Sequence, residues 1–182
     1  MTHALTRPED CALIVIDVQE KLLPVIDGHG AVLANCQRLA RFAGLMDLPV
    51  LACRQRKLGQ IVAPLAQALP PGLEAMEKTS FDCFGLEPFA GAVAGLGRRT
   101  LVLVGIEAHI CVMQTALGAL AAGYAVQVVA DAVGSRAAGN HALALERLRQ
   151  AGALITSAEM FIYELLQRAD RPEFAQVLPL VK

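Results

Sequence analysis

The sequence contains no tryptophan, and aromatic residues make up only 4% of its 182 residues. Because 55% of the residues are hydrophobic, the core must be built from aliphatic side chains, as in layered proteins of helix and sheet. A chain of this length forms one well-buried domain more readily than two. We therefore expect a single domain over residues 1–182.

An excess of charge of one sign is also missing. Sixteen lysine and arginine residues stand against 17 aspartate and glutamate residues, which gives a formal net charge of -1. The sequence shows no basic stripe that would neutralise phosphates and no interleaving of aromatic residues with arginine that would bind single strands. We therefore expect no nucleic-acid partner.

Paired cysteines are absent as well. The five cysteines, Cys11, Cys36, Cys53, Cys83 and Cys111, are odd in number, widely spaced and without a CxxC motif. This pattern argues against both a disulfide framework and a zinc ribbon, and it favours a reducing compartment. The first apolar run is too short for the core of a secretory signal. The expected location is the cytoplasm.

One segment is long enough to cross a membrane, because no charged residue occurs between residues 110 and 130. It contains Gln114, Thr115 and Gln127, however, and its hydrophobic period changes from helical to strand-like near Gly123. We interpret it as a buried helix followed by a buried strand, and we expect no membrane partner.

Short apolar runs alternate with helical patterns along the chain. Strands are predicted at residues 12–16, 49–54, 74–77, 100–106, 124–132 and 153–158, and helices at residues 31–46, 62–68, 88–96, 111–122, 140–150 and 161–168. Six strands joined by connections of helical length predict right-handed βαβ units. The expected fold is a three-layer, Rossmann-like α/β fold, with an open six-stranded parallel sheet and helices on both faces.

Three chemically useful residues follow predicted strands. Asp17 comes directly after the first strand, Lys78 after the third, and Cys111 shortly after the fourth. Ligands of open parallel sheets bind beyond the carboxyl ends of the strands, so these residues are expected at one edge. Each also has an ordinary interpretation: a loop aspartate, a solvated lysine and a small apolar core residue.

Together the three residues predict base-activated nucleophilic catalysis. A carboxylate near a thiol can take its proton, and an ammonium can hold that carboxylate in place. The start of a helix is expected to lower the thiol pKa of Cys111 and to offer N–H groups to an oxyanion. Of the four histidines, His3, His29 and His141 are expected in a terminus, a loop and an exposed helix face, and His109 as a helix cap or pocket wall.

The segments IVIDVQ, EKTSF and GIEAHICV, in this order and at these spacings, resemble the signature segments of the isochorismatase-like cysteine hydrolase superfamily. VVADAVGSR resembles its downstream segment, and the likeness covers residues 11–160. The subgroup most similar to this sequence is that of the isochorismatase domain-containing hydrolases, whose substrate is unsettled.

This resemblance implies a catalytic triad of Asp17, Lys78 and Cys111. It also implies a cis peptide bond between Ile106 and Glu107, and an oxyanion hole formed by the backbone N–H groups of Glu107 and Cys111. The residues expected to bind substrate are Gln19, Leu22, Gln55, Phe81 and His109.

The sequence departs from nicotinamidases of the superfamily, which carry a metal-binding Asp-x-His segment after the second strand. The corresponding stretch here, ACRQRKLGQ, has neither histidine nor carboxylate, so we expect no catalytic metal and no cofactor. Ala108 stands where a threonine often precedes the cysteine by three positions. The presence of Cys111 argues against vinyl-ether hydrolysis, because isochorismate hydrolases often lack this cysteine.

The predicted function is hydrolysis of a small amide or carbonyl-type substrate through a thioester on Cys111. The alternative is a non-catalytic or degenerate protein that uses the same fold for small-molecule binding or assembly. A nucleotide-dependent oxidoreductase is disfavoured, because the glycine cluster GLGRR precedes a strand, whereas the dinucleotide fingerprint follows one. We also expect a homo-oligomer, and an approach of Cys83 to Cys111 that permits redox regulation stays open.

Overall fold

The computed structural model describes residues 5–182 and contains one six-stranded sheet in which all neighbouring strands are parallel. The strands are β1 (Cys11–Ile16), β2 (Val50–Gln55), β3 (Met76–Lys78), β4 (Thr100–Ile106), β5 (Ala125–Gly134) and β6 (Leu154–Thr156). Their order is β3-β2-β1-β4-β5-β6, which is the order of doubly wound Rossmann folds. The predicted fold class is confirmed.

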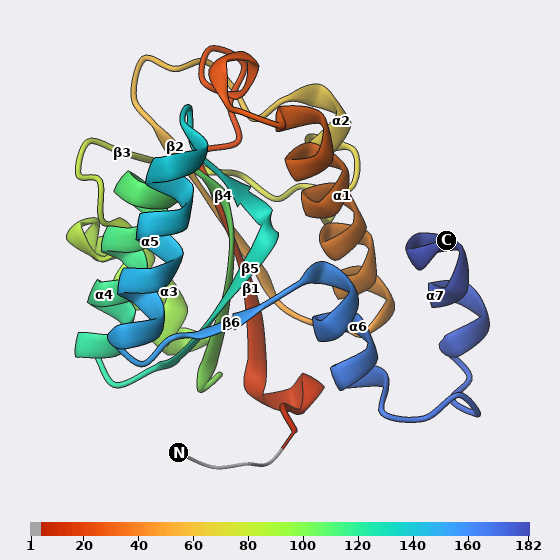
Figure 1. Cartoon of the computed structure of the whole chain (residues 1–182). Coiled ribbons are helices and arrows are strands. Elements are labelled where there is room, and N and C mark those ends of the chain that lie inside the picture. The colour runs from red at the N-terminus through yellow and green to blue at the C-terminus, as the bar shows by residue number, and fades with distance from the viewer. Residues whose placement is uncertain (1–4) are drawn as a thin grey trace.

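Helices cover both faces of this sheet (Figure 1). They are α1 (His29–Leu45), α2 (Ala63–Ala66), α3 (Glu87–Gly95), α4 (Met113–Ala121), α5 (Ala138–Gln150), α6 (Ala158–Leu166) and α7 (Phe174–Val181). In Figure 1, α3, α4 and α5 lie on one face, and α1 and α6 lie on the other, with α7 outside α1. The result is three layers with the sheet in the middle.

The central strands are buried on both faces. Every residue of β1 and β4 is buried, which explains their continuous apolar sequences. Side chains along β1 alternate between two cores: Leu13 and Val15 pack on the α1 side, whereas Ile14 and Ile16 pack on the α4 side. The carboxyl edge of this buried sheet, at the top of Figure 1, carries the site described below.

Two elements differ from the sequence prediction in a useful way. The helix expected from residue 111 begins at Met113, as α4. A π-helical turn over Ala108–Val112 comes directly before it and contains Cys111. The C-terminal helix α7 was not predicted, because Pro179 interrupts its helical pattern. The segment around residues 110–130 contains a helix followed by a strand, α4 and β5, as expected, and the end of the unexpected π-helical turn comes before them. No described helix is long and apolar enough to cross a membrane.

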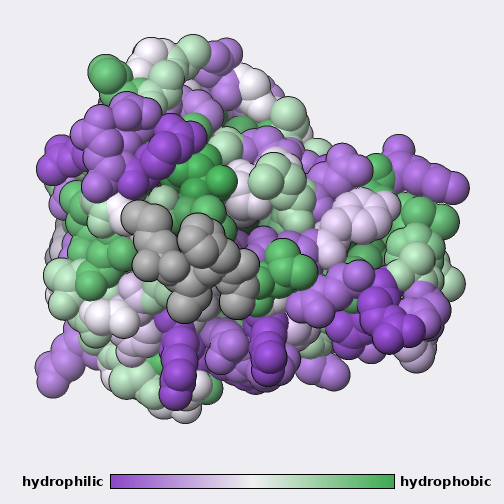
Figure 2. Space-filling view, turned by 60° about the horizontal axis from the view of Figure 1, so that its bottom comes forward, coloured by the Kyte–Doolittle hydropathy of each residue, from purple (hydrophilic) through white to green (hydrophobic). Residues whose placement is uncertain are grey.

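The opposite end of the molecule, where the strands begin, comes forward in Figure 2. Hydrophobic and hydrophilic residues are interspersed over this face. One of the exposed apolar residues of the chain, Leu154, lies on β6, the edge strand of the sheet.

Candidate active site

Asp17 and Lys78 form a buried ion pair at the carboxyl edge of the sheet. Asp17 leaves β1 with a φ of 55°, and its N–H donates to the Cys53 carbonyl at 3.0 Å. Lys78 ends β3, and its Nζ donates to Asp17 Oδ2 at 2.7 Å. Both side chains are 0% exposed. Because β2 lies between β1 and β3, the lysine side chain reaches past a strand to meet the carboxylate.

Cys111 approaches the same carboxylate from the π-helical turn after β4. Its thiol lies close enough to Asp17 for each group to shift the pKa of the other, and the residue is 5% exposed. Within the described chain, Asp17 Oδ1 is buried and has no partner at ordinary hydrogen-bond geometry. Asp17 thus uses one oxygen for Lys78 and keeps an open acceptor beside a thiol. The structure brings the three predicted residues together.

Burial dominates the electrostatics of this cluster. Burial raises the pKa of Asp17, while the charge of Lys78 and its hydrogen bond act in the opposite direction. Burial disfavours the Lys78 ammonium, but Asp17 outweighs this effect and the lysine pKa is raised. Lys78 therefore stays charged at neutral pH, next to a carboxylate that is a stronger base than an exposed aspartate.

The thiol pKa corrects a sequence expectation. Burial and, after it, the charge of Asp17 raise the pKa of Cys111, and Lys78 opposes the shift only in part. The start of a helix was expected to lower this pKa, but burial and a neighbouring anion are stronger effects here. The resting site consequently holds a protonated thiol beside the Asp17 carboxyl group, which is paired with the Lys78 ammonium.

The peptide bond between Ile106 and Glu107 is cis. The Glu107 carbonyl accepts the N–H groups of Ile110 and Val112, at 3.1 and 3.2 Å. The N–H of Cys111, which lies between these two donors, does not donate to this carbonyl. The backbone at both ends of the π-helical turn is thereby held in place next to the thiol.

The carboxylate of Glu107 is engaged inside the protein. Arg136 holds it through Nε at 2.7 Å and through its backbone N–H at 3.3 Å, and the Glu107 side chain is only 5% exposed. His109 lies 3.5 Å from the same carboxylate, and its Nδ1 is 2.9 Å from Ser135 Oγ. His109 Nε2 is 3.4 Å from Asn140 Nδ2. His109 therefore links the π-helical turn to the segment that follows β5.

The other residues expected to bind substrate lie in different surroundings. Gln19 is 0% exposed, and its amide bonds only backbone groups of Gln55 and Gly59. Leu22 packs against the apolar core on the α1 side. Phe81, in contrast, is 50% exposed. Gln19 and Leu22 therefore support the fold around the site, and Phe81 is the member of this set that presents a large apolar surface to solvent.

The remaining histidines are not part of this cluster, and Cys83 lies beside it, close enough to affect the pKa of Lys78. His29 begins α1 instead of lying in a loop, His141 Nε2 is 3.0 Å from the Ala130 carbonyl, and His3 falls outside the described residues. The Cys53 thiol is the neighbour that most affects the raised pKa of Cys83. All five cysteines are free. Among residues 5–182, no three His, Cys, Asp or Glu side chains form a group that could hold a metal ion.

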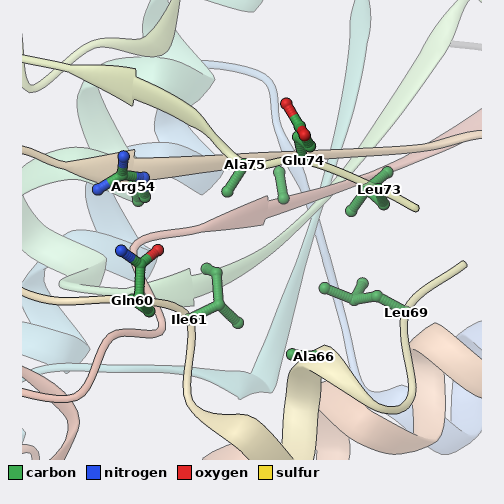
Figure 3. A pocket seen from close by; sticks show the side chains of 9 residues that line it. Arg54, Gln60, Ile61, Ala66, Leu69, Leu73, Glu74 and Ala75 are labelled. Carbon is green, nitrogen blue, oxygen red and sulfur yellow. The ribbon is translucent and has the colours of Figure 1, made fainter. Parts of the chain in front are cut away.

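A separate cavity of about 390 Å³ lies beside β2 (Figure 3). Two of its lining residues, Ala52 and Leu69, belong to the core on the α1 side of the sheet. Its apolar lining includes Ile61 and Leu69, with Arg54 and Gln60 toward one end and Leu73 toward the other. None of the three clustered residues lines it. The candidate site and this cavity are therefore distinct features of the sheet edge.

The isochorismatase domain, as described by its family model, matches residues 11–160. The chain belongs to the isochorismatase domain family. A similar member of this family is a secreted isochorismatase effector of Phytophthora sojae, with 35% identity over 96% of this chain and 86% of that protein. The isochorismatase domain-containing protein 2A of mouse is 32% identical over 96% of this chain and 84% of its own length.

Solved structures agree with the isochorismatase fold. The MAR1 ribonuclease of Caenorhabditis elegans superposes with a TM-score of 0.92, 33% identity and coverage of 98% of this chain and 92% of that one. The YcaC protein of Escherichia coli, described as an octameric hydrolase of unknown specificity, has a TM-score of 0.92 at 24% identity, which shows the fold alone. The superposition with YcaC covers 99% of this chain and 90% of the YcaC chain.

Sequence reasoning did not single out several residues of the site in this isochorismatase domain. Ser80 supplies a carbonyl to Lys78 at 3.3 Å, and Ser135, Arg136 and Asn140 complete the network around Glu107 and His109. The segment VVADAVGSR contains Ser135 and Arg136, so their position was visible in the sequence. Their partners were not, because these lie about 26 to 31 residues away along the chain.

Proposed function

We propose that this isochorismatase domain is a cysteine hydrolase in which Asp17, Lys78 and Cys111 act on a small amide or carbonyl-type substrate. The observation that supports the proposal most directly is the buried Asp17 carboxylate, bonded to Lys78 at 2.7 Å and adjacent to the Cys111 thiol. Thiol, base and a cation that orients the base are the parts that nucleophilic catalysis requires.

In the first half of the proposed reaction, Asp17 takes the thiol proton while the Cys111 sulfur attacks the carbonyl carbon. A C–S bond forms, and the carbonyl oxygen becomes an oxyanion that accepts hydrogen bonds from the N–H groups of Glu107 and Cys111. When this intermediate collapses, the bond to the leaving group breaks and Asp17 returns its proton to that group. The product of this half is a thioester on Cys111.

In the second half, Asp17 takes a proton from water, and the water oxygen attacks the thioester carbon. The C–S bond then breaks, the acid product leaves, and the sulfur regains its proton from Asp17. Lys78 remains protonated throughout, because its pKa is raised and it is the charge partner of Asp17. The two raised pKa values suit this role: the thiol holds its proton until substrate arrives, and the carboxylate is a competent base.

The main alternative is a degenerate binding or assembly protein that keeps the same buried cluster without turnover. The names of similar proteins do not choose a substrate, because they range from a secreted effector to a ribonuclease. For this reason the substrate screen contains small amides, small esters and a single-stranded RNA.

The test compares hydrolysis rates of the full chain and its variants on whichever substrate the screen finds. Cys111→Ala is expected to lower kcat about 10³-fold or more, and Asp17→Asn about 10²-fold or more. Cys36→Ala is the matched control, because Cys36 is also buried but belongs to the core on the other face of the sheet. Retained turnover in folded Cys111→Ala would contradict the proposal, and absence of turnover on every class in the screen favours the degenerate protein.

We further propose that the chain acts as a single-domain homo-oligomer in the cytoplasm. Five free, buried thiols suit a reducing compartment. Exposed Leu154, Met160 and Tyr163 on β6 and α6 suit self-association. Light scattering coupled to size-exclusion chromatography tests the oligomer, and a monomer at all concentrations would contradict it.

A further inference from the structure

Lys78 has a second strong hydrogen bond in addition to the one with Asp17. Its Nζ donates to Gln55 Oε1 at 2.7 Å, the same distance as to Asp17 Oδ2, and to the Ser80 carbonyl at 3.3 Å. An ammonium has three N–H donors and no acceptor, so these three partners use its full capacity. Lys78 is 1% exposed, and an unpaired N–H there would be costly.

The direction of the Gln55 amide is determined by its surroundings. Gln55 Nε2 donates to the Thr79 carbonyl at 2.9 Å, which leaves Oε1 for Lys78. The backbone of Gln55 is held in turn by the buried Gln19, which accepts its N–H at 2.8 Å and donates to its carbonyl at 2.9 Å. A second bond from Gln19 to the Gly59 carbonyl, at 2.8 Å, fixes the loop after β2.

The neutrality of this acceptor has an electrostatic consequence. A glutamine oxygen satisfies an N–H of Lys78 without adding a negative charge, so Asp17 remains the carboxylate that is paired with the ammonium. The other titratable groups that face Lys78 are the Cys111 and Cys83 thiols, and Asp82 lies near enough to feel its charge. The favourable field of the cation therefore acts mainly on the Asp17 carboxylate and the adjacent thiol.

We propose that Gln55, supported by Gln19, is a positioning residue that aims the Lys78 ammonium at the Asp17 carboxylate, and that it is not a substrate contact. This inference rests on the proposed function, because it matters only if Asp17 is the base for Cys111. It replaces the expectation that both glutamines bind substrate.

The reaction of Cys111 with iodoacetamide tests the inference without a known substrate. The sulfur forms a bond to carbon as the carbon–iodine bond breaks, iodide leaves, and the thiol proton passes to Asp17. Rates are measured on the full chain from pH 5 to pH 10, and peptide mass spectrometry assigns the product to Cys111. The wild-type rate is expected to fall on the acid side as Asp17 becomes protonated, and to form a plateau above that limb.

Gln55→Met keeps the size of the side chain and removes its strong acceptor. Its plateau rate is expected to be about tenfold lower, and its acid limb should lie at higher pH, because a poorly held ammonium stabilises ionised Asp17 less. Gln55→Glu restores an oxygen acceptor but adds an anion. Its plateau should be closer to wild type, with the acid limb again at higher pH. The control is Gln60→Met, whose side chain lines the cavity of Figure 3 and should leave rate and limb unchanged.

Asp17→Asn distinguishes a failure of the positioning role of Gln55 from a failure of Asp17 as the base for Cys111. If Asp17→Asn abolishes the acid limb while Gln55→Met and Gln55→Glu match wild type in plateau and limb, the positioning role is wrong and the proposed base stands. If Asp17→Asn keeps the limb, the proposed base is wrong as well. A role of Gln55 in folding alone would lower the melting temperature of Gln55→Met and leave the limb in place, which would also overturn the inference.

Discussion

Asp17 turns away from β1 with a φ of 55°, a left-handed conformation that aspartate tolerates better than most residues. This turn directs its side chain to the point where Lys78 and Cys111 arrive from other strand ends. A single unusual backbone angle thus determines which groups the carboxylate meets. The chemistry expected of the site depends on the ionisation of this one residue.

The pH dependence of turnover follows from the direction of the Asp17 shift. Burial raises its pKa above the ordinary value of about 4, so the ionised base is lost at a higher pH than for an exposed aspartate. Activity should therefore be full above the raised pKa and fall as the pH drops through it. The acid limb of a kcat/KM profile measures this, and a midpoint at or below about 4 would contradict the assignment.

The ion pair between Glu107 and Arg136 should contribute to the stability of the fold. Arg136→Met removes the partner of a carboxylate that is almost fully buried, and it should destabilise the fold by about 1 kcal/mol. The loss is no larger because Arg136 itself is largely exposed to solvent, which weakens the ion pair. The double variant Arg136→Met with Glu107→Gln should recover part of this loss, because the unpaired charge is gone. Urea unfolding of the four proteins in this cycle measures the coupling, and strict additivity would show that the pair contributes nothing.

Among the residues of the site, the sequence indicated Asp17, Lys78 and Cys111 because each follows a predicted strand. It did not indicate the roles of Gln19 and Gln55. Gln19 bonds backbone atoms up to 40 residues away, and Gln55 meets the Lys78 side chain, and neither contact leaves a pattern in the chain. The thiol pKa was predicted in the wrong direction. The helix-start argument considered the local dipole and omitted burial and the charge of Asp17.

Among the elements, β1 and β4 leave no room for a side chain at Gly105. Its φ is 120°, and an added Cβ would lie 2.0 Å from the Ile16 carbonyl oxygen, directly before Asp17. Gly105→Ala should therefore destabilise the fold by about 3 kcal/mol and reduce Cys111 reactivity. Gly44→Ala in α1 is the matched control: nothing lies within 4 Å of its new Cβ, and it should stabilise the helix by about 0.5 kcal/mol.

Urea unfolding and iodoacetamide reactivity measure both glycine variants. Equal stability of Gly105→Ala and wild type would contradict the close packing of β1 against β4. The strands themselves were predictable from sequence, because runs such as residues 101–104 are apolar throughout and are followed or preceded by polar or glycine residues. The π-helical turn was not, since a single extra residue per turn changes no hydrophobic period that a short segment can reveal.

For the whole molecule, the near balance of charge limits the partners. With a net charge of -1, the chain should show no salt-dependent binding to single-stranded RNA, even though the MAR1 protein of similar fold is named a ribonuclease. Fluorescence anisotropy with a labelled RNA at 50 and 200 mM salt measures this. Tight binding that weakens steeply with salt would contradict the prediction and would make a nucleic-acid substrate the leading candidate.

The proposed reaction forms a covalent bond to the Cys111 sulfur, and this bond is measured most directly by rapid acid quenching of the full chain during turnover, followed by mass spectrometry. We predict an acyl adduct on the peptide that contains Cys111, absent from Cys111→Ala and accumulating in the steady state only where deacylation is slow. Turnover that persists in Cys111→Ala, or an adduct located on another residue, would contradict the account.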